Sequence, residues 1–153
     1  MLLINQDLVL ADVNGSNELD FINILAHRAE RLGYLSDVNE FIAAVKKREE
    51  EFSTAFGYGV AIPHGESDTV KSSFLAFCRP VHQILWGDKN RPVQLIFMIG
   101  VPASQKSKYH LKILAHLSRK LLDESFRETL LQAKSSADIF LLLTGLEREI
   151  TAS

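Results

Sequence analysis

A histidine between a proline and a glycine is the residue of this sequence best suited to chemistry. His64 follows an apolar run that ends at Pro63 and precedes Gly65. Proline fixes its own φ and pushes the preceding Ile62 towards an extended conformation. We therefore expect an exposed imidazole that is presented rigidly from the end of a strand. The alternative is that His64 only caps a turn.

Glycines surround this histidine. Gly57, Gly59 and Gly65 remove side-chain bulk and permit positive φ, which suits close approach of another molecule to the backbone. An imidazole has a reference pKa of about 6.5, so its neutral ring, with one lone pair for attack, is well populated near neutral pH. The segment therefore presents an imidazole whose chemistry would allow it to act as a nucleophile.

Two further residues could bind an anion. His110 stands at the start of a predicted helix, where free amides and the macrodipole favour negative charge, or it is a surface histidine that caps the helix. Arg48 offers a planar fork of donors for phosphate oxygens, or it forms an ion pair with the neighbouring glutamates. Ser53 and Thr54 could bind a phosphate oxygen or hold the loop, and the second role is preferred.

The other histidines and the only cysteine do not form a metal site by their spacing. His27 and His116 fall within helical patterns, His82 falls in a loop, and neither HExxH nor CxxC spacing is present. We expect no metal and no cofactor. Cys78 lies in the apolar run FLAFCRPV and is interpreted as a small buried hydrophobic residue.

Two helices should precede the histidine segment. Residues 17–32 carry apolar side chains at three- and four-residue intervals, and Gly33 follows as a stop signal. This apolar face comprises Leu19, Ile22, Leu25, Ala26, Ala29 and Leu32. A second helix should begin after the cap candidate Ser36 and run into the charged residues 46–51. Its buried residues should be Val38, Phe41, Ile42 and Val45.

Strands and three more helices should follow. Glycines and prolines punctuate extended segments between residues 56 and 102, and the run Val93 to Val101 is apolar on both faces, as in a central strand. A helix is predicted over residues 108–122, and shorter helices over 124–132 and 136–143. The first of these should bury Leu111, Leu114, Leu117 and Leu121. Gly145 should close the last helix.

The alternation of helices and strands predicts a three-layer α/β/α sandwich, with a mixed β-sheet flanked by helices on both faces. The 153 residues suit one domain over 1–153, with a flexible tail at 145–153. A net charge of -2 gives no basic field for nucleic acid. No apolar run approaches the roughly 20 residues of a membrane span, and the N-terminus has no signal-peptide pattern. A cytoplasmic location is expected.

The stretch from Arg48 to Glu66, REEEFSTAFGYGVAIPHGE, resembles the signature of the fructose/mannitol class of EIIA domains of bacterial phosphotransferase systems (PTS EIIA type 2). Its parts are an Arg-Glu pair, a Ser-Thr pair, two glycines spaced by one residue, and Ala-Ile-Pro-His-Gly. FIAAVKKRE upstream and PVQLIFMIGVPASQKSKYHLKILAHLSRKL downstream extend the similarity. The sequence departs at Ala55, where glycine is frequent, and at Glu66, which adds negative charge beside the histidine.

The resemblance implies a phosphotransferase component. His64 would accept a phosphoryl group from the phosphohistidine of the carrier HPr and pass it to a cysteine of an EIIB domain on a separate chain. His110 would stabilise the phosphoryl group, and Arg48 would support the site. Apolar residues around the two histidines would form the shared docking surface. The membrane component EIIC would be only an indirect partner.

Two other functions remain open from the sequence. The same family includes nitrogen-regulatory EIIA proteins, which signal by binding other proteins according to their phosphorylation state. Such a protein would keep His64 and differ in its partners. The other alternative is an unrelated α/β binding module in which the Pro-His-Gly turn arose by chance.

Overall fold

The computed structural model describes residues 2–105 and 109–152, and only the backbone of Gln105, Tyr109 and His110 is described. A mixed sheet forms the middle layer, with the strand order β1-β5-β8-β3-β2 and with β4 also paired to β8. These strands are β1 (Val9–Val13), β2 (Ala55–Gly57), β3 (Val60–Ala61), β4 (His64–Ser67), β5 (Phe74–Pro80) and β8 (Leu95–Pro102). A separate hairpin consists of β6 (Ile84–Trp86) and β7 (Arg91–Val93).

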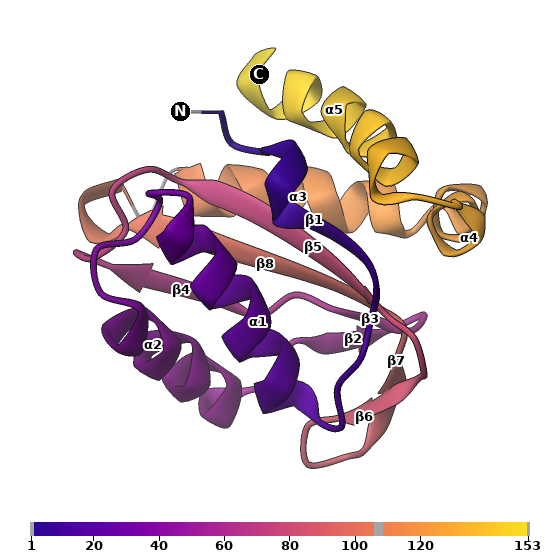
Figure 1. Ribbon diagram of the computed structural model, residues 1–153, viewed down its shortest axis with the longest axis horizontal. Helices are drawn as coiled ribbons and strands as arrows, with labels where there is room; N and C mark the ends of the chain where they lie inside the picture. The colour runs from indigo at the N-terminus through magenta and orange to yellow at the C-terminus, as the bar shows by residue number, and fades with distance from the viewer. Residues whose placement is uncertain (1, 106–108, 153) are drawn as a thin grey trace.

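Helices cover both faces of this sheet (Figure 1). α1 (Glu18–Arg31) and α2 (Val38–Glu51) lie on one face. The other face carries α3 (Tyr109–Leu121), α4 (Glu124–Gln132) and α5 (Ser136–Ala152). Short 3-10 turns, η1 (Gln6–Leu8) and η2 (Ala103–Gln105), precede β1 and follow β8. The predicted three-layer α/β/α sandwich is confirmed.

β8 separates two hydrophobic cores, because its side chains alternate between the faces. Ile96 and Met98 join the core under α1 and α2. Leu95, Phe97, Ile99 and Val101 join the core under α3, α4 and α5. Every side chain named here is at most 1% exposed, so the predicted central strand is confirmed. Among residues 2–105 and 109–152, no helix combines the length and apolar character that a membrane span needs.

The caps of α1 and α2 are asparagine and aspartate. Asn17 accepts a hydrogen bond from the amide of Asp20 at 3.0 Å. The cap of α2 is Asp37 and not Ser36, which corrects the prediction. Both the hydroxyl and the amide of Ser36 bond instead to the carbonyl of Thr69, at 3.2 and 2.9 Å. Ser36 therefore joins α2 to the turn after β4.

Three other sequence expectations are wrong. Leu111 is 64% exposed, because α3 packs through Ile113, Leu117 and Leu121, which follow the four-residue spacing of one helical face. Leu19 is 38% exposed at the start of α1. The last helix does not end before Gly145 but continues to Ala152.

The end of α5 packs against the rest of the chain. Ile150 is fully buried, and the Glu147 carboxylate accepts a hydrogen bond from the amide of Ile4 at 3.0 Å. A glycine inside a helix costs about 1 kcal/mol relative to alanine, and the burial of the residues beyond it outweighs that cost. Residues 145–152 of the segment expected as a flexible tail are thus a packed helical end.

A buried arginine ties α4 to the sheet. Arg79, at the end of β5, is only 7% exposed. Its Nη1 donates to the carbonyl oxygens of Leu130 (2.9 Å), Leu131 (3.3 Å) and Ala133 (2.6 Å). These carbonyls belong to the last turn of α4 and the residue after it, where intrahelical donors are missing. Nη2 also donates to Oδ1 of Asp12 at 3.0 Å.

Replacing Arg79 should therefore destabilise the protein much more than replacing its acidic partner. We expect Arg79→Met to lower the free energy of unfolding by about 2 to 4 kcal/mol, since buried carbonyls lose a charged donor. Asp12→Asn should cost only about 0 to 1 kcal/mol, because the Asp12 side chain is 63% exposed. Urea unfolding would measure both, with the exposed Arg148→Met as control. Equal losses for Arg79→Met and Asp12→Asn would contradict this account.

Candidate functional site

The histidine singled out in the sequence begins strand β4. β3 and β4 both pair in parallel with β8, as Val60 with Leu95 and His64 with Ile99. Between them the chain is interrupted at Ile62 and Pro63, although the Pro63 carbonyl still accepts the amide of Ile99 at 3.1 Å. The proline thus separates two short strands on the same central strand. This break fixes where the His64 side chain leaves the backbone.

One ring nitrogen of His64 is held by the backbone. Nδ1 lies 2.8 Å from the carbonyl oxygen of Ile62, two residues earlier. A carbonyl can only accept a hydrogen bond, so Nδ1 carries the proton that it donates. In the neutral ring the lone pair then belongs to Nε2. The local backbone therefore selects one tautomer, in which the lone pair of the neutral ring is on Nε2.

The ring is much less exposed than the sequence suggested. His64 is only 7% exposed, so the prediction of an exposed imidazole is wrong. The hydrogen bond to Ile62 turns the ring back towards the preceding residues, and most of the residue is shielded from solvent. The rigid presentation was predicted from Pro63, but the burial depends on elements that are distant in sequence.

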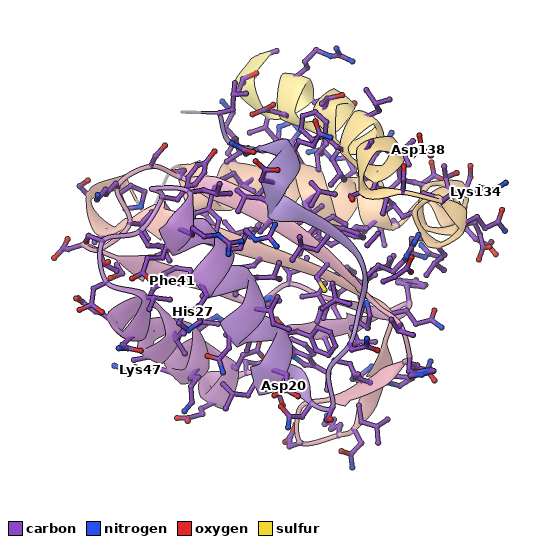
Figure 2. All side chains as sticks on the ribbon, viewed as in Figure 1. Asp20, His27, Phe41, Lys47, Lys134 and Asp138 are labelled. Atoms are coloured by element: carbon purple, nitrogen blue, oxygen red, sulfur yellow. The ribbon has the colours of Figure 1, made fainter. Side chains whose placement is uncertain are left out.

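The register of β4 shows which layer the ring faces. Paired residues of parallel strands point to the same face of a sheet, and His64 pairs with Ile99, which lies in the core under α3. Gly65 faces the other way. A Cβ atom at Gly65 would lie 3.0 Å from Cγ2 of Val45 and 3.1 Å from Cε1 of Phe41, which Figure 2 labels on α2.

The three glycines near His64 therefore have different roles. Gly65 accommodates helix α2 and is not open to another molecule, which corrects the sequence interpretation. Gly57 and Gly59 do have positive φ, of 107° and 76°, in the turn between β2 and β3. A Cβ atom at Gly57 would meet nothing within 4 Å, so this turn is the open part of the segment.

His110 is the second residue of α3 as the structure describes it. Its predicted place at the start of a helix is confirmed, and its side chain lies outside what the structure describes. Figure 1 shows this end of α3 at the same end of the sheet as the end of β4. His64 faces the layer that contains α3. The contact between the two histidines stays a prediction.

Arg48 caps the end of its own helix. Its Nη1 donates to the carbonyl of Phe52 at 2.7 Å, just beyond the last residue of α2. The observed partner is therefore a backbone oxygen and not one of the neighbouring glutamates, so the ion pair considered from the sequence is not what the structure shows. Arg48 as a whole residue is half-buried.

Glu49 is the residue that sequence reasoning missed. Its carboxylate accepts from the Thr54 amide at 3.1 Å, from the Thr54 hydroxyl, and from Nε1 of Trp86 at 3.2 Å. The sequence presented Glu49 as one of three consecutive glutamates and as the glutamate of the Arg-Glu pair, without a role of its own. The Thr54 hydroxyl confirms the preferred interpretation that this pair of polar residues holds the loop. In addition, Ser53 Oγ accepts the amide of Ala55 at 3.3 Å.

A cavity of about 630 Å³ lies elsewhere, between the start of α1, the end of α2 and the β6–β7 hairpin. Its lining includes Glu18, Glu49, Phe52 and Arg91 but not His64. Burial raises the pKa of the Glu18 carboxyl, and the charge of Glu49 adds to that rise, whereas a hydrogen bond from the amide of Gly87 opposes it. The cavity is thus separate from the histidine site.

The remaining histidines and the cysteine match their predicted positions. His27 is exposed on α1 (Figure 2), His116 lies in α3, and His82 lies between β5 and β6. Cys78 is fully buried in β5, as predicted. Burial raises the pKa of its thiol to about 12.

The profile of one protein family, described as phosphoenolpyruvate-dependent sugar phosphotransferase system, EIIA 2, matches residues 2–145. Two curated relatives illustrate the similarity. The PTS system fructose-specific EIIA component of Haloferax volcanii is 37% identical over 119 residues, which are 77% of each chain. Multiphosphoryl transfer protein 1 of Escherichia coli (strain K12) is 32% identical over 143 residues, but this chain spans only 17% of its length.

Solved structures share the fold. The nitrogen regulatory protein IIA-Ntr from Neisseria meningitidis superposes with a TM-score of 0.83 at 28% identity, covering 92% of this chain and 96% of that one. Enzyme IIAMTL, in its complex with phosphorylated enzyme IIBMTL from Escherichia coli, gives a TM-score of 0.76 at 22% identity. That match covers 90% of this chain and 95% of the other.

The buried thiol gives a test of the core around the site. With a pKa of about 12, only about one Cys78 thiol in ten thousand is ionised at pH 8, and the side chain is fully buried. We expect an aromatic disulfide reagent to leave the native protein unmodified and to react stoichiometrically after unfolding in urea. Absorbance of the released thiol would measure both. Rapid reaction of the folded protein would show that β5 is not packed as described.

Proposed function

The chain belongs to the EIIA 2 family of the phosphoenolpyruvate-dependent sugar phosphotransferase system, and from this membership we propose that it is a phosphocarrier that uses His64. It takes a phosphoryl group from phospho-HPr and passes it to a cysteine of an EIIB domain. The observation that carries the proposal is the hydrogen bond between Nδ1 of His64 and the Ile62 carbonyl, because it leaves Nε2 as the attacking atom.

The geometry of His64 allows phosphoryl transfer to Nε2 with a balanced exchange of bonds. The lone pair of Nε2 forms a new P–N bond while the P–N bond of the donor phosphohistidine breaks, and the donor ring keeps that electron pair. Positive charge develops on the His64 ring and is shared with Nδ1–H. The Ile62 carbonyl dipole already points at that hydrogen, so it stabilises the charge without reorganisation. In the onward step, the thiolate of the EIIB cysteine forms a P–S bond while the P–N bond to Nε2 breaks, and Nε2 regains its lone pair.

The phosphoryl oxygens need donors of their own. Phosphoryl transfer depends mainly on alignment and on groups that stabilise charge on the equatorial oxygens. The first-turn amides of α3 and the His110 side chain are the proposed donors, since a helix N-terminus favours anions. We assign Arg48 a supporting role, in which it holds the end of α2 through the Phe52 carbonyl.

The similar proteins support particular partners for this chain. The fructose-specific relative, at 37% identity, favours a sugar-transport role over the nitrogen-regulatory alternative. The complex of enzyme IIAMTL with phosphorylated enzyme IIBMTL supports an EIIB domain as the acceptor. The membrane component EIIC would then be reached only through EIIB. We propose that the reaction takes place in the cytoplasm.

Replacing the nucleophile should abolish phosphorylation. We expect His64→Gln to take no phosphate from phosphoenolpyruvate, enzyme I and HPr, whereas the exposed His27→Gln should behave like wild type. Mass spectrometry of the intact proteins would show the acid-labile phosphoryl group, and peptide mapping would show its position. Normal phosphorylation of folded His64→Gln would overturn the assignment.

Replacing His110 should slow the reaction without abolishing it. Removal of one preorganised donor typically costs about 2 to 4 kcal/mol of transition-state stabilisation, so His110→Ala should lose on the order of a hundred- to a thousandfold in rate. Acceptance from HPr and transfer to EIIB should both suffer, because the same oxygens need the same donor. Rapid-quench kinetics would measure the two steps. Wild-type rates would make His110 a bystander, and phosphate on His110 would reverse the two roles.

A further inference from the structure

A chain of hydrogen bonds leads from Glu49 to the reactive ring. Glu49 accepts the amide and the hydroxyl of Thr54. The carbonyl of Thr54 accepts the amide of Ile62 at 3.3 Å, and the carbonyl of Ile62 in turn holds Nδ1 of His64 at 2.8 Å. Each link fixes the orientation of the next peptide group. The carbonyl that sets the tautomer of His64 thus belongs to a residue whose amide is anchored through Thr54.

The anchor itself is rigid. Nε1 of Trp86 donates to the Glu49 carboxylate at 3.2 Å, and the Trp86 side chain is fully buried. A carboxylate has no hydrogen to donate, so it can take all three donors, two from Thr54 and one from Trp86. Thr54 is therefore held by both its backbone and its side chain, which leaves its carbonyl little freedom to turn.

Helix α2 contacts the histidine segment on both sides of His64. Phe41, Val45 and Glu49 recur every four residues and so lie along one face of α2. Phe41 and Val45 pack on Gly65, immediately after the histidine. Glu49 reaches Ile62, two residues before the histidine, through Thr54. One face of α2 thus fixes the position of the backbone before and after His64.

From this arrangement we propose that Glu49 is a positioning residue for phosphoryl transfer, which acts through Thr54 and Ile62 to keep His64 in the tautomer with its lone pair on Nε2. Glu49 does not touch the phosphoryl group in this proposal. Glu49 instead increases the population of the Nδ1–H tautomer of His64 and fixes the direction of the lone pair on Nε2. The proposal rests on the function assigned above to His64.

Three substitutions separate this role from simple loss of charge or of stability. Glu49→Ala removes the acceptor for Thr54. Glu49→Gln removes the charge but keeps an oxygen for the amide, and its NH2 group can donate to the Thr54 hydroxyl oxygen. Glu50→Ala removes the charge of the next residue, which is exposed. Thr54→Val, which deletes only the hydroxyl link, serves as a second probe should Glu49→Ala fail to fold.

The decisive measurement detects the tautomer of the His64 ring directly. Long-range proton–nitrogen NMR correlations distinguish the two neutral tautomers of a histidine and need no phosphorylation. We expect the Nδ1–H form of His64 to dominate in wild type, Glu49→Gln and Glu50→Ala, and to mix with the Nε2–H form in Glu49→Ala. Thr54→Val should shift the tautomers in the same direction by a smaller amount. Thermal unfolding would set a temperature at which every variant is folded.

Phosphorylation by phospho-HPr gives the second measurement. Glu49→Ala should react on the order of tenfold more slowly than wild type, as expected when an outer residue no longer orients a reacting group. Glu49→Gln and Glu50→Ala should stay close to the wild-type rate. The tautomer shift and the rate loss should rise together from Thr54→Val to Glu49→Ala.

Several outcomes would overturn the proposal. A wild-type tautomer in both folded Glu49→Ala and Thr54→Val would show that the ring is set by Ile62 alone. An equal loss in Glu50→Ala, or in Glu49→Gln, would assign the effect to charge. If wild type takes no phosphate, the proposed function fails, whereas the tautomer comparison still decides whether Glu49 positions the ring.

Discussion

The pairing of β8 with its neighbours is the constraint on which the rest of the structure depends. This strand is buried on both faces and pairs with β5 on one side and with β3 and β4 on the other. Its alternating side chains supply the centre of both cores, so the helices of each outer layer are placed relative to it. The histidine segment gains its position from the same strand. Because β3 and β4 share one partner across the break at Pro63, the chain can kink there and remain in the sheet.

Much of this could be predicted from the sequence, because the signals are local. Proline before His64, positive φ at Gly57 and Gly59, and an apolar run at residues 93–101 each act within a few residues. The depth of His64 could not be predicted in that way, since it depends on a sheet and helices far along the chain. The same is true of Gly65, whose missing side chain is explained only by Val45 and Phe41 of α2.

The errors in the helices have a similar cause. Leucine at position 111 fits the helical period of α3 almost as well as isoleucine at 113, and only packing against the sheet decides which face is buried. Gly145 looked like a stop, but its helix continues because Leu146 and Ile150 reach the core. Glu49 was named in the Arg-Glu pair but was given no role, since the sequence does not show that its carboxylate binds Thr54 and Trp86. In each case the outcome depends on contacts with residues distant in sequence and not on local helix propensity.

The low solvent exposure of His64 also affects how long a phosphorylated histidine would survive hydrolysis. A phosphoramidate is lost to any water that can reach the phosphorus in line with the P–N bond, and with 7% of the residue exposed such approaches are few. The same restriction applies to a partner, which must bring its reactive atom in along a narrow set of directions and so needs a protruding surface. Burial of the acceptor would thus slow hydrolysis of the phosphohistidine. Transfer to proteins of complementary shape would still be possible.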